Sequence, residues 1–185
     1  NGSGSAPQNV AHNLTVTPEL MIVKYRDGAT NWYVYHSALG NTKADYLDTD
    51  TVPNTSAVFW NNTSPTATQF TLGSFASGSG KYIAYLFATL AGISKVGSVV
   101  HSGTTNVDCG FSAGARFVLV KRTDSTGGWY VWDSVRGIVA GNDPYFFLNS
   151  TAAQVTNTDY IDPLASGFTL TSSFTAGTYI FLAIA

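Results

Sequence analysis

Charged side chains are scarce in this sequence. Only 11% of its 185 residues are Asp, Glu, Lys or Arg, less than half the roughly 25% that is usual for soluble domains. The 9 Lys and Arg residues do not outnumber the 11 Asp and Glu residues, so there is no basic surface of the kind that binds nucleic acid. The hydrophobic fraction of 44% and the aromatic fraction of 14% are high enough for a packed core and exclude an intrinsically disordered chain.

Cysteine pairs and long apolar runs are also missing. Cys109 is the only cysteine, so no internal disulfide can form. The longest apolar run, residues 82–88, has the length of a β-strand and falls far short of the roughly 18–20 residues of a membrane-spanning helix. Residues 1–5 have neither the basic nor the apolar segment of a secretory signal. We therefore expect no membrane insertion, and folding either in a reducing compartment or without the help of a disulfide.

The most informative feature present is an internal repeat. Residues 19–40 (ELMIVKYRDGATNWYVYHSALG) align without a gap with residues 116–137 (RFVLVKRTDSTGGWYVWDSVRG), at an offset of 97. The identical pairs are Val23/Val120, Lys24/Lys121, Asp27/Asp124, Trp32/Trp129, Tyr33/Tyr130, Val34/Val131, Ser37/Ser134 and Gly40/Gly137. A unit of roughly 90 residues is one supersecondary block or one small domain, and not a solenoid repeat. We divide the chain into a first repeat, 1–92, and a second repeat, 93–185, and expect the two to pack closely.

Each repeat is predicted to consist of β-strands. Apolar segments at 20–24 and 117–121 precede aromatic, alternating segments at 32–36 and 129–133, and turn residues lie between them. Further strands are expected at residues 44–47, 57–60, 69–72, 82–87, 145–148, 168–170 and 179–184. No window of 11 residues or more has helical periodicity. We predict an all-β, antiparallel β-sandwich built from two internal repeats.

The alternation in the aromatic segments assigns their side chains to two faces. Tyr33 and Tyr35 are expected in the core, as are their counterparts in the second repeat, Tyr130 and Trp132. The opposite face ends in a polar residue in both repeats, His36 and Asp133, so we expect that end of each strand to approach solvent.

The offset also exposes an incomplete edge. Residues 96–100 (VGSVV) correspond to positions before and at residue 1, so the first repeat lacks the start of this strand. An open strand edge favours pairing with another chain. Two explanations remain: the sequence is a segment of a longer chain, or the missing strand comes from a neighbouring subunit.

Groups able to carry out catalysis are few. His12, His36 and His101 have no histidine counterpart at the offset of 97, so no histidine chemistry is present in both repeats. We predict no enzymatic centre, no cofactor and no tightly bound transition metal, which would need several nitrogen or sulfur ligands. A nucleophilic pair of Cys109 with His12 or His101 is the alternative.

Two sets of repeated or clustered acidic residues have simple explanations. Lys24 and Lys121 end apolar strands, and Asp27 and Asp124 begin the turns that follow. We expect either an ion pair across the turn or hydrogen bonds from turn amides to the aspartate. Asp45, Asp48 and Asp50 are expected to be solvated loop acids, although a weak calcium site there stays open because calcium uses such carboxylates.

One segment has the composition of a sugar-binding loop. Trp60 precedes Asn61 and Asn62, which would place a flat ring beside two amides that donate and accept hydrogen bonds. We select Trp60, Asn61, Asn62 and Tyr46 as candidate ligand-binding residues, with packing in the core as the competing interpretation of Trp60. Such a ligand would contact loops, because the strand faces are needed for the core.

Several segments together resemble a known repeat module. They are residues 18–24 (PELMIVK), 31–36 (NWYVYH), 39–43 (LGNTK), 82–88 (YIAYLFA), 91–97 (AGISKVG) and 120–124 (VKRTD). They are similar to a tandem-repeat β module of tailed-bacteriophage virion proteins, a family of unknown function found in tail-fibre-like or surface proteins. The resemblance covers most of both repeats, but members usually have glycine after the first histidine, where this sequence has Asn13. It implies no catalytic residue.

Taken together, these features predict a non-enzymatic structural and adhesion module on the surface of a virion, folded in the host cytoplasm. It would belong to a phage tail fibre or surface protein that contacts host-surface glycan. The alternative is a capsid decoration or fibre-assembly module that binds only other virion proteins. The expected partners are other virion proteins, copies of the chain itself and a host-surface glycan, with no nucleic acid and no membrane.

Overall fold

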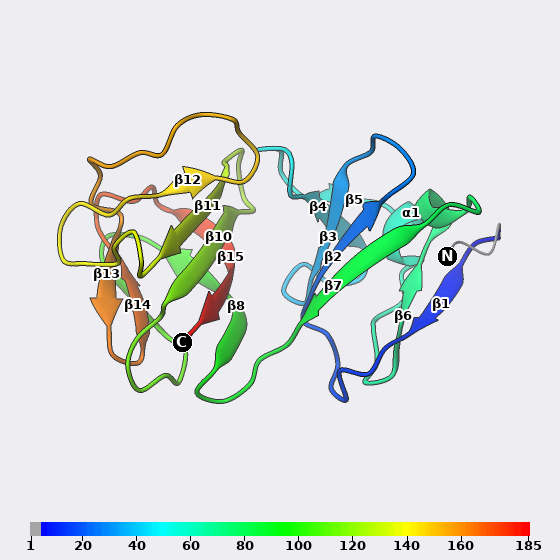
Figure 1. Cartoon of the computed structure of the whole chain (residues 1–185), viewed down its shortest axis with the longest axis horizontal. Helices are drawn as coiled ribbons and strands as arrows, with labels where there is room; N and C mark the ends of the chain where they lie inside the picture. Colours follow the sequence, from blue (N-terminus) through cyan, green and yellow to red (C-terminus); the bar gives the residue numbers. More distant parts are fainter. Residues whose placement is uncertain (1–4) are drawn as a thin grey trace. The chain divides into compact units, whose positions relative to one another are not determined.

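The computed structural model describes residues 5–185 and is all-β, with 41% strand and 4% helix (Figure 1). This confirms the predicted all-β, antiparallel fold class. The chain forms two compact units. The first contains the residues up to Asp48 together with Pro53–Ala88, and the second contains Thr49–Val52 and Thr89–Ala185. The short segment Thr49–Val52 is therefore part of the second unit, although the residues on both sides of it belong to the first.

The first unit contains a five-stranded antiparallel sheet and a two-stranded sheet. The large sheet has the order β5 (Asn54–Thr55), β4 (Lys43–Tyr46), β3 (Trp32–His36), β2 (Leu20–Tyr25) and β7 (Tyr82–Phe87). The small sheet pairs β1 (Gln8–Ala11) with β6 (Gln69–Leu72). The core of the unit combines residues of both sheets, because alternate side chains of β2 and β6 point to the same interior. This arrangement is compatible with the predicted β-sandwich.

Two short helical segments complete the core of the first unit. They are α1 (Ala57–Trp60) and the 3-10 helix η1 (Ser74–Ala76). The prediction of a strand at residues 57–60 is wrong because the local capping groups favour a helical turn. The Ser56 hydroxyl accepts a hydrogen bond from the Val58 amide, and Asn61 ends the turn in the left-handed conformation, with φ of 53°.

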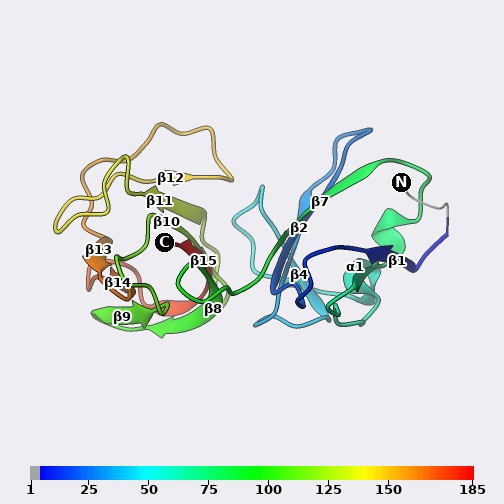
Figure 2. The same ribbon diagram turned by 60° about the horizontal axis from the view of Figure 1, so that its bottom comes forward.

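The second unit contains a five-stranded sheet and a three-stranded sheet, which form two layers (Figure 2). The large sheet has the order β12 (Phe146–Phe147), β11 (Trp129–Asp133), β10 (Phe117–Arg122), β15 (Gly177–Ile184) and β8 (Ser94–His101). The other sheet has the order β13 (Ile161–Leu164), β14 (Gly167–Leu170) and β9 (Thr105–Asp108). Side chains from both sheets, such as Val120 and Phe168, form one hydrophobic core.

Hydrogen bonds recur in the two units at positions 97 apart. The Glu19 amide donates to the Phe87 carbonyl, and the Arg116 amide donates to the Ile184 carbonyl. The central hairpins also share their register: Lys24 lies opposite Trp32, as Lys121 lies opposite Trp129. These hydrogen bonds and registers lie at equivalent positions of the two units, and the superposition of the two repeats stays a prediction.

The units differ at one edge of their large sheets. In the second unit, β15 lies inside the sheet and pairs along its whole length with β8. In the first unit, β7 corresponds to β15 but is the last strand of its sheet among residues 5–185. Residues 1–4, onto which the end of the missing strand falls in the sequence alignment, lie outside the described residues.

Candidate functional site

The predicted ring for sugar stacking is not accessible. Trp60 is 0% exposed, its indole nitrogen donates to the Lys43 carbonyl at 2.8 Å, and its ring contacts Tyr35 and Phe75 edge to face. Trp60 is therefore a core residue, and the expectation that it offers a stacking surface is wrong. Trp60 precedes two asparagines in the sequence, but the helical turn α1 directs its indole ring into the core of the first unit, and Asn61 ends the turn.

The other residues selected with Trp60 have different surroundings. Asn61 and Asn62 are exposed, and both have a left-handed backbone, with φ of 53° and 52°. Tyr46 is half-buried and packs against Tyr33 and Phe59. A glycan contact by Asn61 and Asn62 stays a prediction, without the ring that motivated it.

The three loop aspartates do not share a site. Asp45 is fully buried and accepts a hydrogen bond from the Tyr46 amide, whereas Asp48 accepts one from the Trp32 amide. Asp50 is exposed and belongs to the segment Thr49–Val52 of the second unit. Within residues 5–185, no three His, Cys, Asp or Glu side chains are grouped so that they could hold a metal ion.

The histidines and the cysteine are placed in separate environments. Both ring nitrogens of His101 lie within hydrogen-bond distance of other groups, the Thr105 hydroxyl and the Phe174 carbonyl. Cys109 is buried, and burial raises the pKa of its thiol to about 11, which keeps it protonated and a poor nucleophile. His36 is only 1% exposed, so the expectation that its end of the strand approaches solvent is wrong, whereas its counterpart Asp133 is partly exposed.

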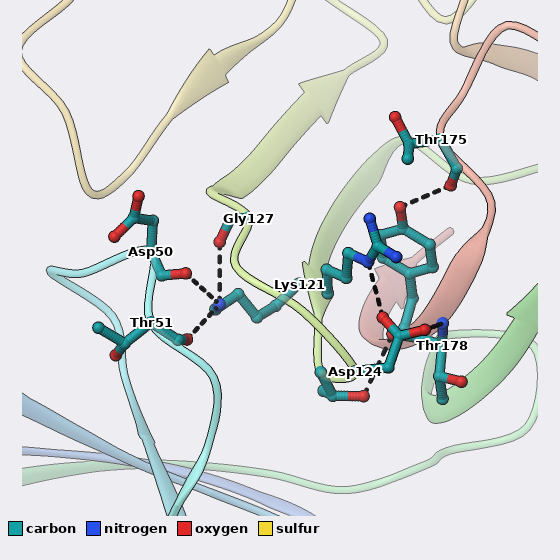
Figure 3. Close-up of polar contacts among 10 residues, drawn as sticks. Asp50, Thr51, Lys121, Asp124, Gly127, Thr175 and Thr178 are labelled. Carbon is teal, nitrogen blue, oxygen red and sulfur yellow. Dashed lines mark hydrogen bonds and ion pairs between the residues drawn. The ribbon is translucent and has the colours of Figure 1, made fainter.

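A buried lysine holds the segment Thr49–Val52 in the second unit (Figure 3). Lys121 is 0% exposed, and its ammonium group donates to the carbonyls of Thr51 at 2.7 Å, Gly127 at 2.9 Å and Asp50 at 3.4 Å. The Gly127 amide also donates to the Asp50 carbonyl at 2.9 Å. These contacts give Lys121 a structural role, because its charge is used to order a loop.

The repeated turn aspartates hold the start of a neighbouring strand, and Figure 3 shows the aspartate of the second unit, Asp124. Asp124 accepts hydrogen bonds from the Arg122 guanidinium at 2.6 Å and from the Thr178 amide at 3.0 Å. The arginine hydrogen bond lowers the pKa of the Asp124 carboxyl. Asp27 accepts a hydrogen bond from the Lys81 amide at 2.8 Å, the equivalent contact in the first unit. In the second unit Asp124 thus forms an ion pair with Arg122, a residue other than the repeated lysine, and the amide that each aspartate binds lies outside its own turn.

The most accessible unusual feature is the free edge of β7. Among the described residues, this strand pairs only with β2. Ile83 is 37% exposed and Tyr85 is 44% exposed, whereas the corresponding residues of β15, Ile180 and Leu182, are 1% and 3% exposed. The backbone groups on the outer side of β7 are therefore available to another strand.

A cavity of about 110 Å³ lies beside this edge, within the first unit. Its walls come from both sheets and include Gln8, Val10, Val23, Phe70, Leu72, Tyr82 and Ala84. At the offset of 97, Ala84 corresponds to Phe181, which is buried in the second unit and packs edge to face on Phe168, with ring centroids 5.5 Å apart. The first unit thus has a small side chain where the second has a large one.

Comparison with known proteins identifies the family. The family model described as "Domain of unknown function (DUF7483)" matches residues 1–185, and the chain belongs to this family. No curated protein and no solved structure matches the chain. The helices within residues 5–185 are too short to span a membrane.

Proposed function

We propose that this DUF7483 domain is a non-enzymatic structural module of a virus particle that binds other virion proteins, and that the free edge of β7 accepts a further β-strand. The observation that carries the proposal is that edge, which is unpaired among residues 5–185 and has apolar side chains exposed. The resemblance of the sequence to phage virion modules supports the location in a tail fibre or other surface protein.

The sequence of β7 has none of the features that usually protect an edge strand. Proteins discourage edge pairing with proline, lysine or a β-bulge. Residues 82–87 (YIAYLF) contain no proline and no charge, and they pair with β2 residue by residue without a bulge. By contrast, β8, which ends the large sheet of the second unit, contains Lys95. The edge of β7 is thus suited to pairing.

The burial of Trp60 favours assembly over adhesion as the primary role. The glycan-binding hypothesis depended on an exposed ring, and this ring is in the core. Strand addition needs only backbone hydrogen bonds and alternating side-chain contacts, both of which β7 offers. We therefore place fibre assembly or capsid decoration first, with other virion proteins as partners.

A peptide with the sequence of β8 (SKVGSVVH) tests whether the edge accepts a strand. Hydrogen–deuterium exchange of the full chain is measured with and without the peptide, and we expect slower exchange in β7. The control peptide carries Gly97→Pro and Ser98→Pro, which remove amide donors, and should have no effect. Unchanged exchange in β7 at millimolar peptide would contradict strand addition. Antibody labelling of purified particles tests the location: absence of the protein from the particle surface would refute the virion role.

A further inference from the structure

We infer that the second unit binds a calcium ion between the carboxylates of Asp143 and Asp162, with the hydroxyl of Thr158 as a further ligand. Asp143 precedes β12, Thr158 precedes β13, and Asp162 lies within β13. The ion would join the two ends of the connection between these strands. The site is independent of the free edge of β7, which belongs to the first unit.

Backbone hydrogen bonds bring the three residues together. The Asp143 amide donates to the Thr158 carbonyl at 2.7 Å. The Asp143 carboxyl accepts hydrogen bonds from the backbone amides of Val139, at 2.8 Å, and Ile161. Asp162 directly follows Ile161 in β13. Burial raises the pKa of the Asp143 carboxyl, and the charge of Asp162 raises it further, so the two carboxyl groups are close enough to repel each other.

Oxygen atoms of these side chains are buried without hydrogen-bond partners. Asp143 is 0% exposed; its Oδ1 accepts the hydrogen bond from Val139, but its Oδ2 has no partner within residues 5–185. The same is true of Thr158 Oγ1 and Asp162 Oδ1, and also of Oδ1 of the neighbouring Asp159. A buried polar atom without a partner costs free energy, so a group of them in one region points to a ligand that they share.

The charges in this region favour a cation as that ligand. The charged side chains that act on Asp143 are those of Asp162 and Asp159, and both are negative. A water molecule could donate hydrogen bonds to two carboxylates, but their mutual repulsion would persist. A divalent cation between them removes the repulsion and also compensates the burial of the charge on Asp143.

The ligand atoms favour calcium among the divalent cations. All of them are oxygens, which bind hard cations, whereas transition metals prefer nitrogen and sulfur. Calcium accepts six to eight oxygens in flexible geometry, so backbone carbonyls and water can complete its shell, whereas magnesium needs a nearly ideal octahedron. Within residues 5–185 no three acidic side chains form a metal-binding group, so the site has two carboxylates. We therefore expect weak binding, with a Kd on the order of 0.1–1 mM.

Thermal unfolding of the full chain tests the site. The protein is freed of metal with a chelator, transferred to buffer at about pH 7.5 and titrated with calcium chloride to about 10 mM at constant ionic strength. We expect the melting temperature to rise by roughly 3–10 °C, because the ion binds only the folded state. Hydrogen–deuterium exchange should become slower at residues 139–162, and magnesium chloride should have a smaller effect.

Matched substitutions locate the ion. Asp143→Asn and Asp162→Asn should each remove most of the calcium-induced rise. Neither should lower the melting temperature in metal-free buffer, because each removes one of two like charges that repel; an aspartate with a purely structural role would behave differently. Asp50→Asn is the control, since Asp50 is an exposed acid outside this region, and it should keep the full rise.

Three results would overturn the calcium site. They are no rise in the melting temperature at about 10 mM calcium, an equal rise with magnesium, and a full rise in both Asp143→Asn and Asp162→Asn. If the aspartate variants do not fold, Thr158→Val decides, because it removes a ligand and keeps every charge. We expect this variant to bind calcium severalfold more weakly, and an unchanged Kd would refute the site.

Discussion

Replacing Lys121 by methionine should destabilise the second unit much more than the equivalent change, Lys24→Met, destabilises the first. Methionine keeps most of the length of the side chain but has no donor. The ammonium group of Lys121 donates to three carbonyls, two of them at 2.7 and 2.9 Å. A hydrogen bond from a charged group contributes roughly 1.5–3 kcal/mol, and the desolvation of the buried charge offsets part of the total. We expect a loss of about 2–4 kcal/mol.

Lys24 is a matched control because it makes the corresponding contact in a more exposed place. It is half-buried and donates to the Thr30 carbonyl, 97 positions before Gly127, and its ammonium nitrogen lies 5.7 Å from the centre of the Trp32 ring. Water can replace these contacts, so the loss should stay below about 1 kcal/mol.

Urea denaturation followed by tryptophan fluorescence measures the difference between the two variants. With a slope of about 2 kcal/mol per M, Lys121→Met should lower the unfolding midpoint by on the order of 1–2 M, and Lys24→Met by less than about 0.5 M. Hydrogen exchange should also become faster at residues 49–52 in the Lys121→Met variant. Equal effects of the two substitutions would refute the argument that Lys121 orders this segment.

Two further substitutions test buried residues. Trp60→Ala should lower stability by about 3–5 kcal/mol and the melting temperature by roughly 10 °C, because the indole is fully buried; a shift of only a few degrees would show that Trp60 is not a core residue. Asp143 is 0% exposed, and burial, with smaller effects of Asp162 and Asp159, raises its pKa to about 6. The folded state binds the Asp143 proton more tightly than the unfolded state does. The resulting contribution to the free energy of unfolding is complete below about pH 4, where the carboxyl is protonated in both the folded and the unfolded state. It is lost as the pH rises through 6. The loss in the free energy of unfolding is at most about 3 kcal/mol, and Asp143→Asn should abolish this pH dependence. Parallel pH profiles of stability for the native and variant chains would refute the assignment of the pH dependence to Asp143.

Strand positions were predictable where a segment is alternating or is an apolar run of strand length. The segments 69–72 and 82–87 form strands with the predicted bounds: polar and apolar residues alternate in the first, and the second is a short, continuous apolar run. Of the strand β8 the repeat indicates only residues 96–100, since Gly97 and Ser98 interrupt its apolar pattern and its pairing depends on β15, about 80 residues later in the chain. Local periodicity does not contain that information.

The candidate site was predictable only in part. The incomplete edge followed from the offset of the repeat, and β7 is indeed the last strand of its sheet among residues 5–185. The cavity was not foreseen, although the exchange of Phe181 for Ala84 is visible in the alignment. The sequence leaves a ligand-binding and a core position open for Trp60, because composition alone does not distinguish a loop from a capped helical turn, whose direction depends on Ser56 and Asn61. The buried contacts of Lys121 join residues about 70 positions apart, beyond the reach of any local pattern.

The position of the segment Thr49–Val52 in the second unit affects the folding of the chain during synthesis and the recombination of its repeats. During synthesis this segment leaves the ribosome about 70 residues before Lys121, a delay of roughly 4–14 s at 5–20 residues per second. During that interval the carbonyls of Asp50 and Thr51 cannot accept a hydrogen bond from Lys121, because Lys121 belongs to the second repeat and has not yet been synthesised. A recombination event that separated the repeats between Ala88 and Thr89 would leave Lys121 without two of its acceptors. The smallest piece that evolution can exchange without this loss is therefore the pair of repeats.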